Sequence, residues 1–118
     1  MGSLDGKVVL VTGAAGGIGR ATARHLHDEG ATVVATAVGG SRVKELAEEF
    51  ESDRWTAHSL DVTDERDVAS AVEFTVTTFG RLDGIVNNAG ILIPNDVVSA
   101  TAGEYERTFD VNVKGVFL

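Results

Sequence analysis

The chain has 118 residues, of which 43% are hydrophobic, so it has the size of one domain with one packed core. Its formal net charge of −8 repels nucleic acids and anionic lipids, and we expect neither as a partner. The absence of cysteine excludes disulfides, thiolate catalysis and cysteine-ligated zinc. Because it shows no signal-peptide pattern and no apolar run of membrane-spanning length, we predict one soluble, cytoplasmic domain over residues 1–118.

Apolar runs and helical patterns alternate from the N-terminus onward. Residues 7–12 are β-branched and almost continuously apolar, which is typical of a strand buried on both faces of a parallel sheet. A glycine-rich turn leads into a helix predicted over about 18–29, which Gly30 closes. The second strand is predicted over 31–37.

The middle of the chain repeats this alternation. After a Gly-Gly loop, Ser41 is expected to cap a helix that runs to about residue 51, and a third strand follows over 55–60. Thr63 is expected to cap the next helix, whose first turn is acidic and therefore suits the positive end of the helix dipole. That helix ends at Gly80.

The last predicted elements are a strand over 82–87 and a final helix. The loop between them holds the single proline, Pro94, and Thr101 and Glu104 have the spacing of a capping box at the start of the helix. The order βαβαβαβα predicts an α/β fold with a doubly wound parallel sheet.

A glycine-rich stretch over residues 12–19 joins the first strand to the first helix. Gly13 can make the tight turn, Gly17 would let a pyrophosphate approach the backbone, and Gly19 would let the helix pack closely. A turn after a strand aims the free N–H groups of the helix at a ligand, which favours phosphate binding over a glycine turn that binds nothing. A P-loop is excluded because no Gly-Lys-Ser/Thr follows.

The spacing Gly-x-x-x-Gly-x-Gly resembles that of the short-chain dehydrogenase/reductase family. Three further stretches match the family in the right order: Asp61-Val62 after the third strand, Asn87-Asn88-Ala89-Gly90 after the fourth, and Asn112 in the last helix. The resemblance covers the whole chain. It implies a Rossmann-type sheet of strand order 3-2-1-4 that is truncated relative to the family, because the family continues with further strands.

The resemblance also implies a nicotinamide dinucleotide cofactor at the carboxyl ends of the strands. The glycine stretch would hold the pyrophosphate, Asp61 the adenine amino group, and the residues after the fourth strand the ribose and nicotinamide. Asn112 would hold a water molecule of a proton relay and is the single candidate catalytic residue. The candidate cofactor-binding residues are Gly13, Ala15, Gly16, Gly17, Ile18, Gly19, Ala37, Val38, Arg42, Asp61, Val62, Asn88, Ala89, Gly90 and Val111.

Several of these residues have a plainer alternative role. Asp61 could equally cap the third helix, in competition with Thr63. Asn87 is expected to tie the strand end to a neighbouring loop, and Asn88 could do the same, although we favour a cofactor role. Asn112 could simply face solvent, but asparagine is a poor residue for the middle of a helix. The histidines lack i, i+4 helical spacing, so we expect no metal site.

The choice between NAD and NADP depends on the end of the second strand. Ala37 and Val38 offer no carboxylate for the adenosine 2′-hydroxyl, which weakens the case for NAD. Gly16 is not the arginine that many NADP-dependent members carry. Arg42, helped by the Ser41 hydroxyl, could reach a 2′-phosphate, or it could be an ordinary arginine at a helix start. The sequence leans slightly towards NADP.

The family's catalytic groups are missing from these residues. The family uses a tyrosine, a lysine four residues later that lowers the tyrosine pKa, and a serine. The single tyrosine, Tyr105, precedes Asn112 and is followed four residues later by Phe109. We therefore predict the cofactor portion of an oxidoreductase that transfers hydride between nicotinamide and a carbonyl or alcohol, inactive by itself. The alternative is a stand-alone nucleotide-binding or self-assembling domain.

The fourth strand is interior in the family but would be an edge here, with unpaired backbone groups. We expect a homo-oligomer that forms through this strand and the last helix.

Overall fold

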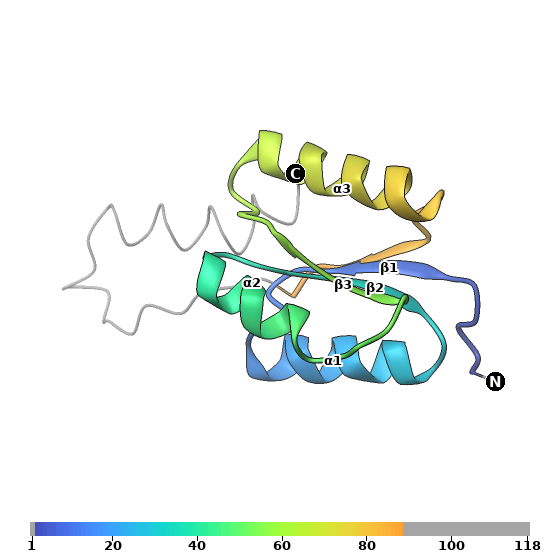
Figure 1. Ribbon diagram of the computed structural model, residues 1–118. Helices are drawn as coiled ribbons and strands as arrows, with labels where there is room; N and C mark the ends of the chain where they lie inside the picture. Colours follow the sequence, from blue (N-terminus) through green and yellow to red (C-terminus); the bar gives the residue numbers. More distant parts are fainter. Residues whose placement is uncertain (1, 89–118) are drawn as a thin grey trace, which may run out of the picture.

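The computed structural model of the chain describes residues 2–88 and places them in a parallel sheet with helices on both faces (Figure 1). Within these residues the sheet order is β3-β2-β1-β4, which confirms the expected Rossmann-type order. The strands are β1 (Val8–Val11), β2 (Thr32–Ala37), β3 (Trp55–Ser59) and β4 (Gly84–Val86), and the helices are α1 (Gly17–Asp28), α2 (Gly40–Ala47) and α3 (Glu65–Phe79).

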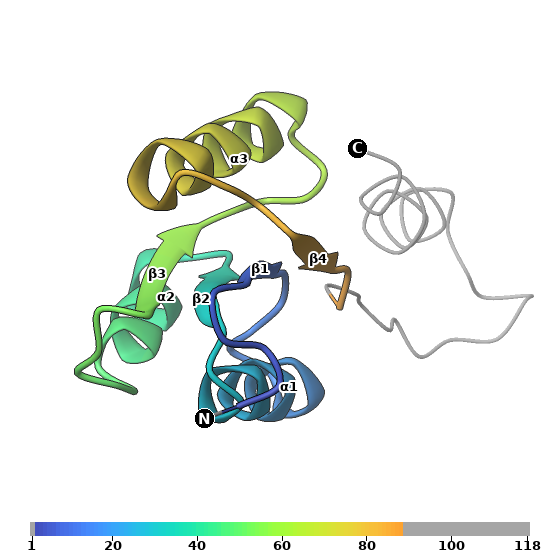
Figure 2. The same ribbon diagram turned by 90° about the vertical axis from the view of Figure 1, so that its right-hand side faces the viewer.

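The two faces of the sheet are covered by different helices: α1 and α2 lie on one side and α3 on the other (Figures 1 and 2). Along β1 the side chains alternate between the two cores. Val9 and Val11 belong to the cluster that includes Ala23 of α1, whereas Leu10 belongs to the cluster that includes Ala71 of α3. Burial on both faces explains why the sequence of this strand is apolar at every position.

The start of α2 differs from the sequence expectation. The helix begins at Gly40, its N-cap is Gly39, and no side chain caps it, so the prediction that Ser41 caps the helix is wrong. Gly39 has φ of 98°, a conformation that glycine adopts easily, and it turns the chain directly into the helix. Ser41 consequently lies inside the first turn, and the helix ends at Ala47, earlier than expected.

The start of α3 also differs. Asp64 is the N-cap, and its carboxylate accepts hydrogen bonds from the backbone N–H groups of Arg66 and Asp67 at 2.9 and 3.3 Å. The Thr63 hydroxyl instead donates to Asp61 Oδ1 at 2.6 Å, so neither Thr63 nor Asp61 caps the helix. The end of the helix is as expected, because Gly80 closes it in the left-handed conformation with φ of 80°.

Among the strands of residues 2–88, β4 is the sheet edge next to β1, as the strand order predicted, and it is shorter than expected. Asp83 fastens its start to β1: the Asp83 backbone N–H donates to the Val8 carbonyl, and the Asp83 carboxylate accepts from the Val8 N–H, both at 2.8 Å. The hydrogen bond from Arg81 and that from Val8 lower the pKa of Asp83. Ile85, in the middle of this edge strand, is 47% exposed.

An aromatic cluster joins the last turn of α1 to the connection between α2 and β3. The buried ring of His27 stacks on Phe50 with a centroid distance of 4.3 Å and meets Trp55 edge-on at 5.7 Å. His27 Nε2 is 2.9 Å from Ser52 Oγ, whereas buried Nδ1 has no hydrogen-bond partner. Arg54 donates to the His27 carbonyl in the last turn of α1 and to the Ala31 carbonyl just before β2, both at 2.9 Å, and so helps to cap this helix.

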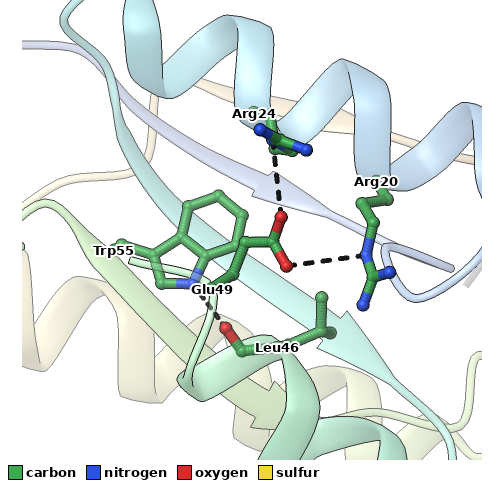
Figure 3. A network of polar contacts seen from close by, with 5 residues as sticks. All are labelled: Arg20, Arg24, Leu46, Glu49 and Trp55. Carbon is green, nitrogen blue, oxygen red and sulfur yellow. Dashed lines mark hydrogen bonds and ion pairs between the residues drawn. The ribbon is translucent and has the colours of Figure 1, made fainter. Parts of the chain in front are cut away.

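A second set of polar contacts holds the same connection to α1. The Glu49 carboxylate forms ion pairs with Arg24 at 3.4 Å and with Arg20 at 3.8 Å, and both arginines come from one side of α1 (Figure 3). Trp55 Nε1 donates a hydrogen bond to the Leu46 carbonyl at 2.7 Å (Figure 3). The C-terminal end of α2 is therefore tied to α1 and to β3. Among residues 2–88, no helix combines the length and apolar character needed to cross a membrane.

Candidate functional site

The connection from β1 to α1 is a tight turn whose geometry depends on glycine. Gly13 has φ of 64°, in the left-handed region, as the sequence predicted for the turn. Gly19 is buried, and a Cβ built on it would overlap the Gly13 carbonyl oxygen and Asn88 Nδ2. The sequence predicted that Gly19 would let the helix pack closely on the strand; the close contacts at Gly19 are instead with the turn itself and with the Asn88 side chain just after β4.

The N-terminus of α1 carries unsatisfied donors. Its N-cap, Gly16, provides no side chain, and the first helical hydrogen bond runs from the Arg20 N–H to the Gly16 carbonyl at 2.8 Å. The N–H groups of residues 17–19 therefore have no acceptor within the helix. Gly17 has open space where a Cβ would be, and Ile18 is 78% exposed. Such a helix end attracts an anion through its N–H groups and its dipole.

β4 holds the glycine turn from one side. The Thr12 hydroxyl donates to the Val86 carbonyl at 3.3 Å and accepts from the Asn88 N–H at 3.0 Å. Asn88 Nδ2 donates to the Gly13 carbonyl at 3.3 Å. Asn88 therefore performs the tying role that the sequence predicted for Asn87 and offered as the alternative for Asn88. A contact between Asn88 and a cofactor stays a prediction.

β2 holds the turn from the other side through Thr36. Its hydroxyl donates to the Val11 carbonyl at 2.8 Å, and its carbonyl accepts from the Ala14 N–H at 2.9 Å. Sequence reasoning missed this residue because it read β2 as an apolar strand. The available signal was a threonine just before the end of a strand buried on both faces, where a hydroxyl needs a partner.

The connection from β2 to α2 is the second candidate region. Ala37 is buried at the end of β2, Val38 is 58% exposed, and Ser41 and Arg42 are exposed in the first turn of α2. The uncapped N-terminus of α2 adds backbone N–H groups beside these side chains. This connection thus offers a cation, a hydroxyl and amide donors, and no carboxylate.

The connection after β3 contains Asp61 and Val62. Val62 is buried under α3, and Asp61 is partly buried. Asp61 Oδ1 accepts from both the N–H and the hydroxyl of Thr63, and the Asp61 N–H donates to the Asp67 carboxylate at 3.0 Å. The carboxylate is therefore fixed in place, and its second oxygen, Oδ2, can serve as an acceptor.

The remaining candidates, Ala89, Gly90, Val111 and Asn112, lie outside the described residues, as do Tyr105 and the expected capping box of the last helix. Within residues 2–88 no three His, Asp or Glu side chains gather in a way that could hold a metal ion.

The described candidates share one location. Each follows or ends β1, β2, β3 or β4 at its carboxyl end, which is the ligand-binding edge of an open α/β sheet. The fold and this edge define a Rossmann-type domain with a glycine-rich connection after its first strand.

The chain belongs to the short chain dehydrogenase family, whose family model matches residues 7–118. It is 41% identical to secoisolariciresinol dehydrogenase of Forsythia intermedia over 117 residues, covering 98% of this chain and 42% of that protein. It is 40% identical to the 3-oxoacyl-(acyl-carrier-protein) reductase FabG of Thermotoga maritima over 116 residues, covering 97% of this chain and 47% of that protein.

Solved structures agree with these relatives. The 3-ketoacyl-(acyl-carrier-protein) reductase of Brucella melitensis, solved as a complex with NADH, has a TM-score of 0.91 and 38% identity, covering 98% of this chain and 48% of that one. A second short-chain dehydrogenase/reductase from the same organism has a TM-score of 0.93 and 29% identity. The chain thus spans about half the length of the relatives that it matches.

Proposed function

We propose that this chain is the cofactor-binding portion of an oxidoreductase and holds the pyrophosphate of a nicotinamide dinucleotide at the N-terminus of α1. The observation that carries the proposal is the set of unsatisfied N–H groups at residues 17–19, next to open space at Gly17 and above a turn held from both sides. Neutral backbone donors suit this chain, because its overall charge of −8 opposes an anion.

The other connections would hold the rest of the cofactor. Asp61 Oδ2 would accept from the adenine amino group, since Oδ1 is engaged by Thr63. Asn88 would contact the ribose side from the end of β4, next to the Gly13 carbonyl. When bound, the nicotinamide donates or accepts a hydride.

We further propose a preference for NADP. Arg42 and Ser41 lie exposed in the first turn of α2, next to an uncapped helix N-terminus, and a 2′-phosphate could bind all three kinds of donor. An NAD site would place a carboxylate at this strand end to accept from the 2′-hydroxyl, and residues 37–40 have none.

The chemistry of hydride transfer requires an acid or base that these 118 residues lack. Tyr105 is not followed by a lysine four residues later, and Asn112 is the single candidate for a proton relay. We propose that the 118-residue chain binds cofactor without turnover. Oxidation of NADPH by the purified chain with a panel of ketones would contradict this.

The first experiment is a fluorescence titration of the purified chain with NADPH and with NADH. Saturable binding should be lost in Gly17→Val. The Cβ of the new side chain would meet no other atom of the protein, so the variant should fold, but the side chain would occupy the space where the phosphate approaches. Absence of binding to the folded wild-type chain would contradict the proposed function.

Arg42→Ala tests the cofactor preference. We expect NADPH affinity to fall about tenfold and NADH affinity to stay unchanged, because a charge-assisted hydrogen bond contributes about 1.5 kcal/mol or more. Lys44→Ala, which removes an exposed cation from the same helix, is the matched control. Unchanged NADPH affinity in Arg42→Ala would remove Arg42 from the site.

The exposed side of β4 supports a second proposal, that the chain self-associates. Ile85 is 47% exposed on this edge strand, and Val76 of α3 is 43% exposed. We expect a dimer or larger species by light scattering at high concentration. A monomer under those conditions would contradict this proposal.

A further inference from the structure

Thr36 is the one polar residue among the fully buried positions of β2, since the other threonine, Thr32, is only partly buried at the start of the strand. Its neighbours along β2 are small or β-branched apolar residues, and its own side chain is fully buried, with 0% exposure. It is the residue before Ala37, where β2 ends and the proposed 2′-phosphate region begins. Valine has nearly the same size and shape and would fill this space without a polar group. A buried hydroxyl costs free energy unless it is hydrogen-bonded, so its partners matter here.

The bonds of Thr36 fall on both sides of the glycine turn. The hydroxyl binds the Val11 carbonyl, two residues before Gly13, and the Thr36 carbonyl receives the N–H of Ala14, directly after Gly13. One residue of β2 therefore fixes the chain just before the turn, at Val11, and directly after Gly13, at Ala14. The turn has little freedom to rotate the amides that follow.

A comparison within the molecule shows that burial alone does not explain this arrangement. Thr75 is also 0% exposed, and its hydroxyl donates to the Ala71 carbonyl of its own helix at 2.8 Å. Thr75 satisfies itself locally, as buried threonines in helices commonly do. Thr36 instead bonds across to the neighbouring strand, at the last residue before the turn region.

We infer that Thr36 is a positioning residue for the phosphate-binding amides of α1. It does not touch the cofactor itself; it holds the Gly13 turn so that the N–H groups of residues 17–19 point at the pyrophosphate. The inference rests on the proposed dinucleotide site and adds a residue outside the glycine motif to it. Its specific consequence is that the hydroxyl matters for ligands that carry a pyrophosphate and not for adenosine.

The test compares two ligands in three variants by NMR-detected titration of the full chain. In Thr36→Val, which keeps the shape and removes the hydroxyl, we expect ADP to bind about three- to tenfold more weakly while adenosine affinity is unchanged. Thr36→Ser keeps the hydroxyl and should bind ADP as the wild type does. Thr75→Val, which removes a buried hydroxyl far from the turn, should leave the ADP-to-adenosine affinity ratio unchanged. If Thr36→Val does not fold, Thr36→Ala takes its place.

Unchanged ADP affinity in Thr36→Val, or an equal loss for ADP and adenosine, would overturn the inference. If the folded wild type binds neither ligand, the proposed function fails, and hydrogen exchange then decides the positioning role separately. In that case the Ala14 N–H should exchange faster in Thr36→Val than in wild type or Thr36→Ser, relative to the N–H of Val34 in the middle of β2. Equal protection of Ala14 in all three proteins would overturn the positioning role.

Discussion

The two strand-to-helix connections on one face of the sheet are held to very different degrees. The connection from β1 to α1 is bonded to β2 through Thr36 and to β4 through Asn88. The connection from β2 to α2 contains an exposed Val38 and a Gly39 with φ of 98°, and no side chain caps the helix that follows. The β1–α1 connection is therefore held by hydrogen bonds to both neighbouring strands, whereas the β2–α2 connection beside it is exposed and its helix is uncapped.

The difference matches what each connection is proposed to bind. A pyrophosphate is common to NAD and NADP, and a fixed set of N–H groups recognises it best because nothing has to be ordered on binding. The 2′ position distinguishes the two cofactors, and it would meet exposed side chains that can change without disturbing the core. The other end of α2 is anchored by Glu49 and the aromatic cluster.

The largest expected effect comes from breaking the fixed turn at Gly19. In Gly19→Ala the new Cβ meets the Gly13 carbonyl and Asn88 Nδ2, neither of which can move without losing its own hydrogen bonds. We expect the free energy of unfolding to fall by about 2 kcal/mol, even though alanine favours helix, and dinucleotide binding to be lost. Urea unfolding measures the first effect. Gly17→Ala, with open space around it, is the control and should be at least as stable as wild type.

Acid should weaken the anchored end of α2. Burial lowers the pKa of His27, the positive charge of Arg54 lowers it further, and the negative charge of Asp28 opposes both by raising it. The unfolded chain therefore binds a proton near its ordinary pKa of about 6.5 while the folded chain does not. Stability from this group is complete above that pH and declines as the pH falls towards the lower folded pKa, by at most about 1.4 kcal/mol per pH unit.

The measurement is urea unfolding between pH 7.5 and 5 in three proteins. His27→Phe, which preserves an aromatic ring beside Phe50 and Trp55, should flatten the pH dependence in this window. His25→Gln, which alters an exposed histidine two residues away on the same helix, is the matched control variant. Equal slopes in His27→Phe and wild type would show that His27 is not the group responsible.

A smaller effect is expected from removing the bond between β4 and the glycine turn. Asn88→Ala deletes the donor to the Gly13 carbonyl, and we expect a loss of about 1 kcal/mol in the free energy of unfolding. Asn87→Ala changes the exposed neighbour and should be neutral. If the two variants lose the same amount, the β4 side of the turn is not held by Asn88.

The smallest effect is expected at the ion pairs between α1 and Glu49. Both arginines are partly exposed, with side-chain exposures of 37% and 56%, so solvent screens them and Glu49→Gln should cost about 0.5 kcal/mol or less. Raising the salt concentration should shrink the difference further. Glu48→Gln, next to it and exposed, is the control. A loss above 1 kcal/mol would mean that the carboxylate does more than pair with surface cations.

Patterns that depend on neighbours in the sequence were predictable, and bonds between distant strands were not. The apolar run of β1, the turn at Gly13 and the helix end at Gly80 follow from local chemistry and were predicted correctly. The caps at Ser41 and Thr63 were predicted wrongly, because nearby residues, Gly39 and Asp64, occupy the N-cap positions of α2 and α3 instead.

The role of Thr36 required knowing which carbonyl of β1 lies opposite it, and register between strands is not written in either strand alone. The same holds for His27, whose aromatic neighbours are supplied by the connection between α2 and β3.

The position of β4 in the sheet has a consequence for how the chain folds. β1, β2 and β3 pair with their neighbours along the chain, whereas β4 crosses back to β1, and the bond between Asn88 and Thr12 joins residues 76 positions apart. Closing that long loop costs more chain entropy than the preceding steps, so we expect β4 to dock last. Until β4 docks, the glycine turn is held only by β2. In a folding intermediate without β4, the N–H groups of residues 17–19 would therefore not yet have the orientation that they have in the folded chain.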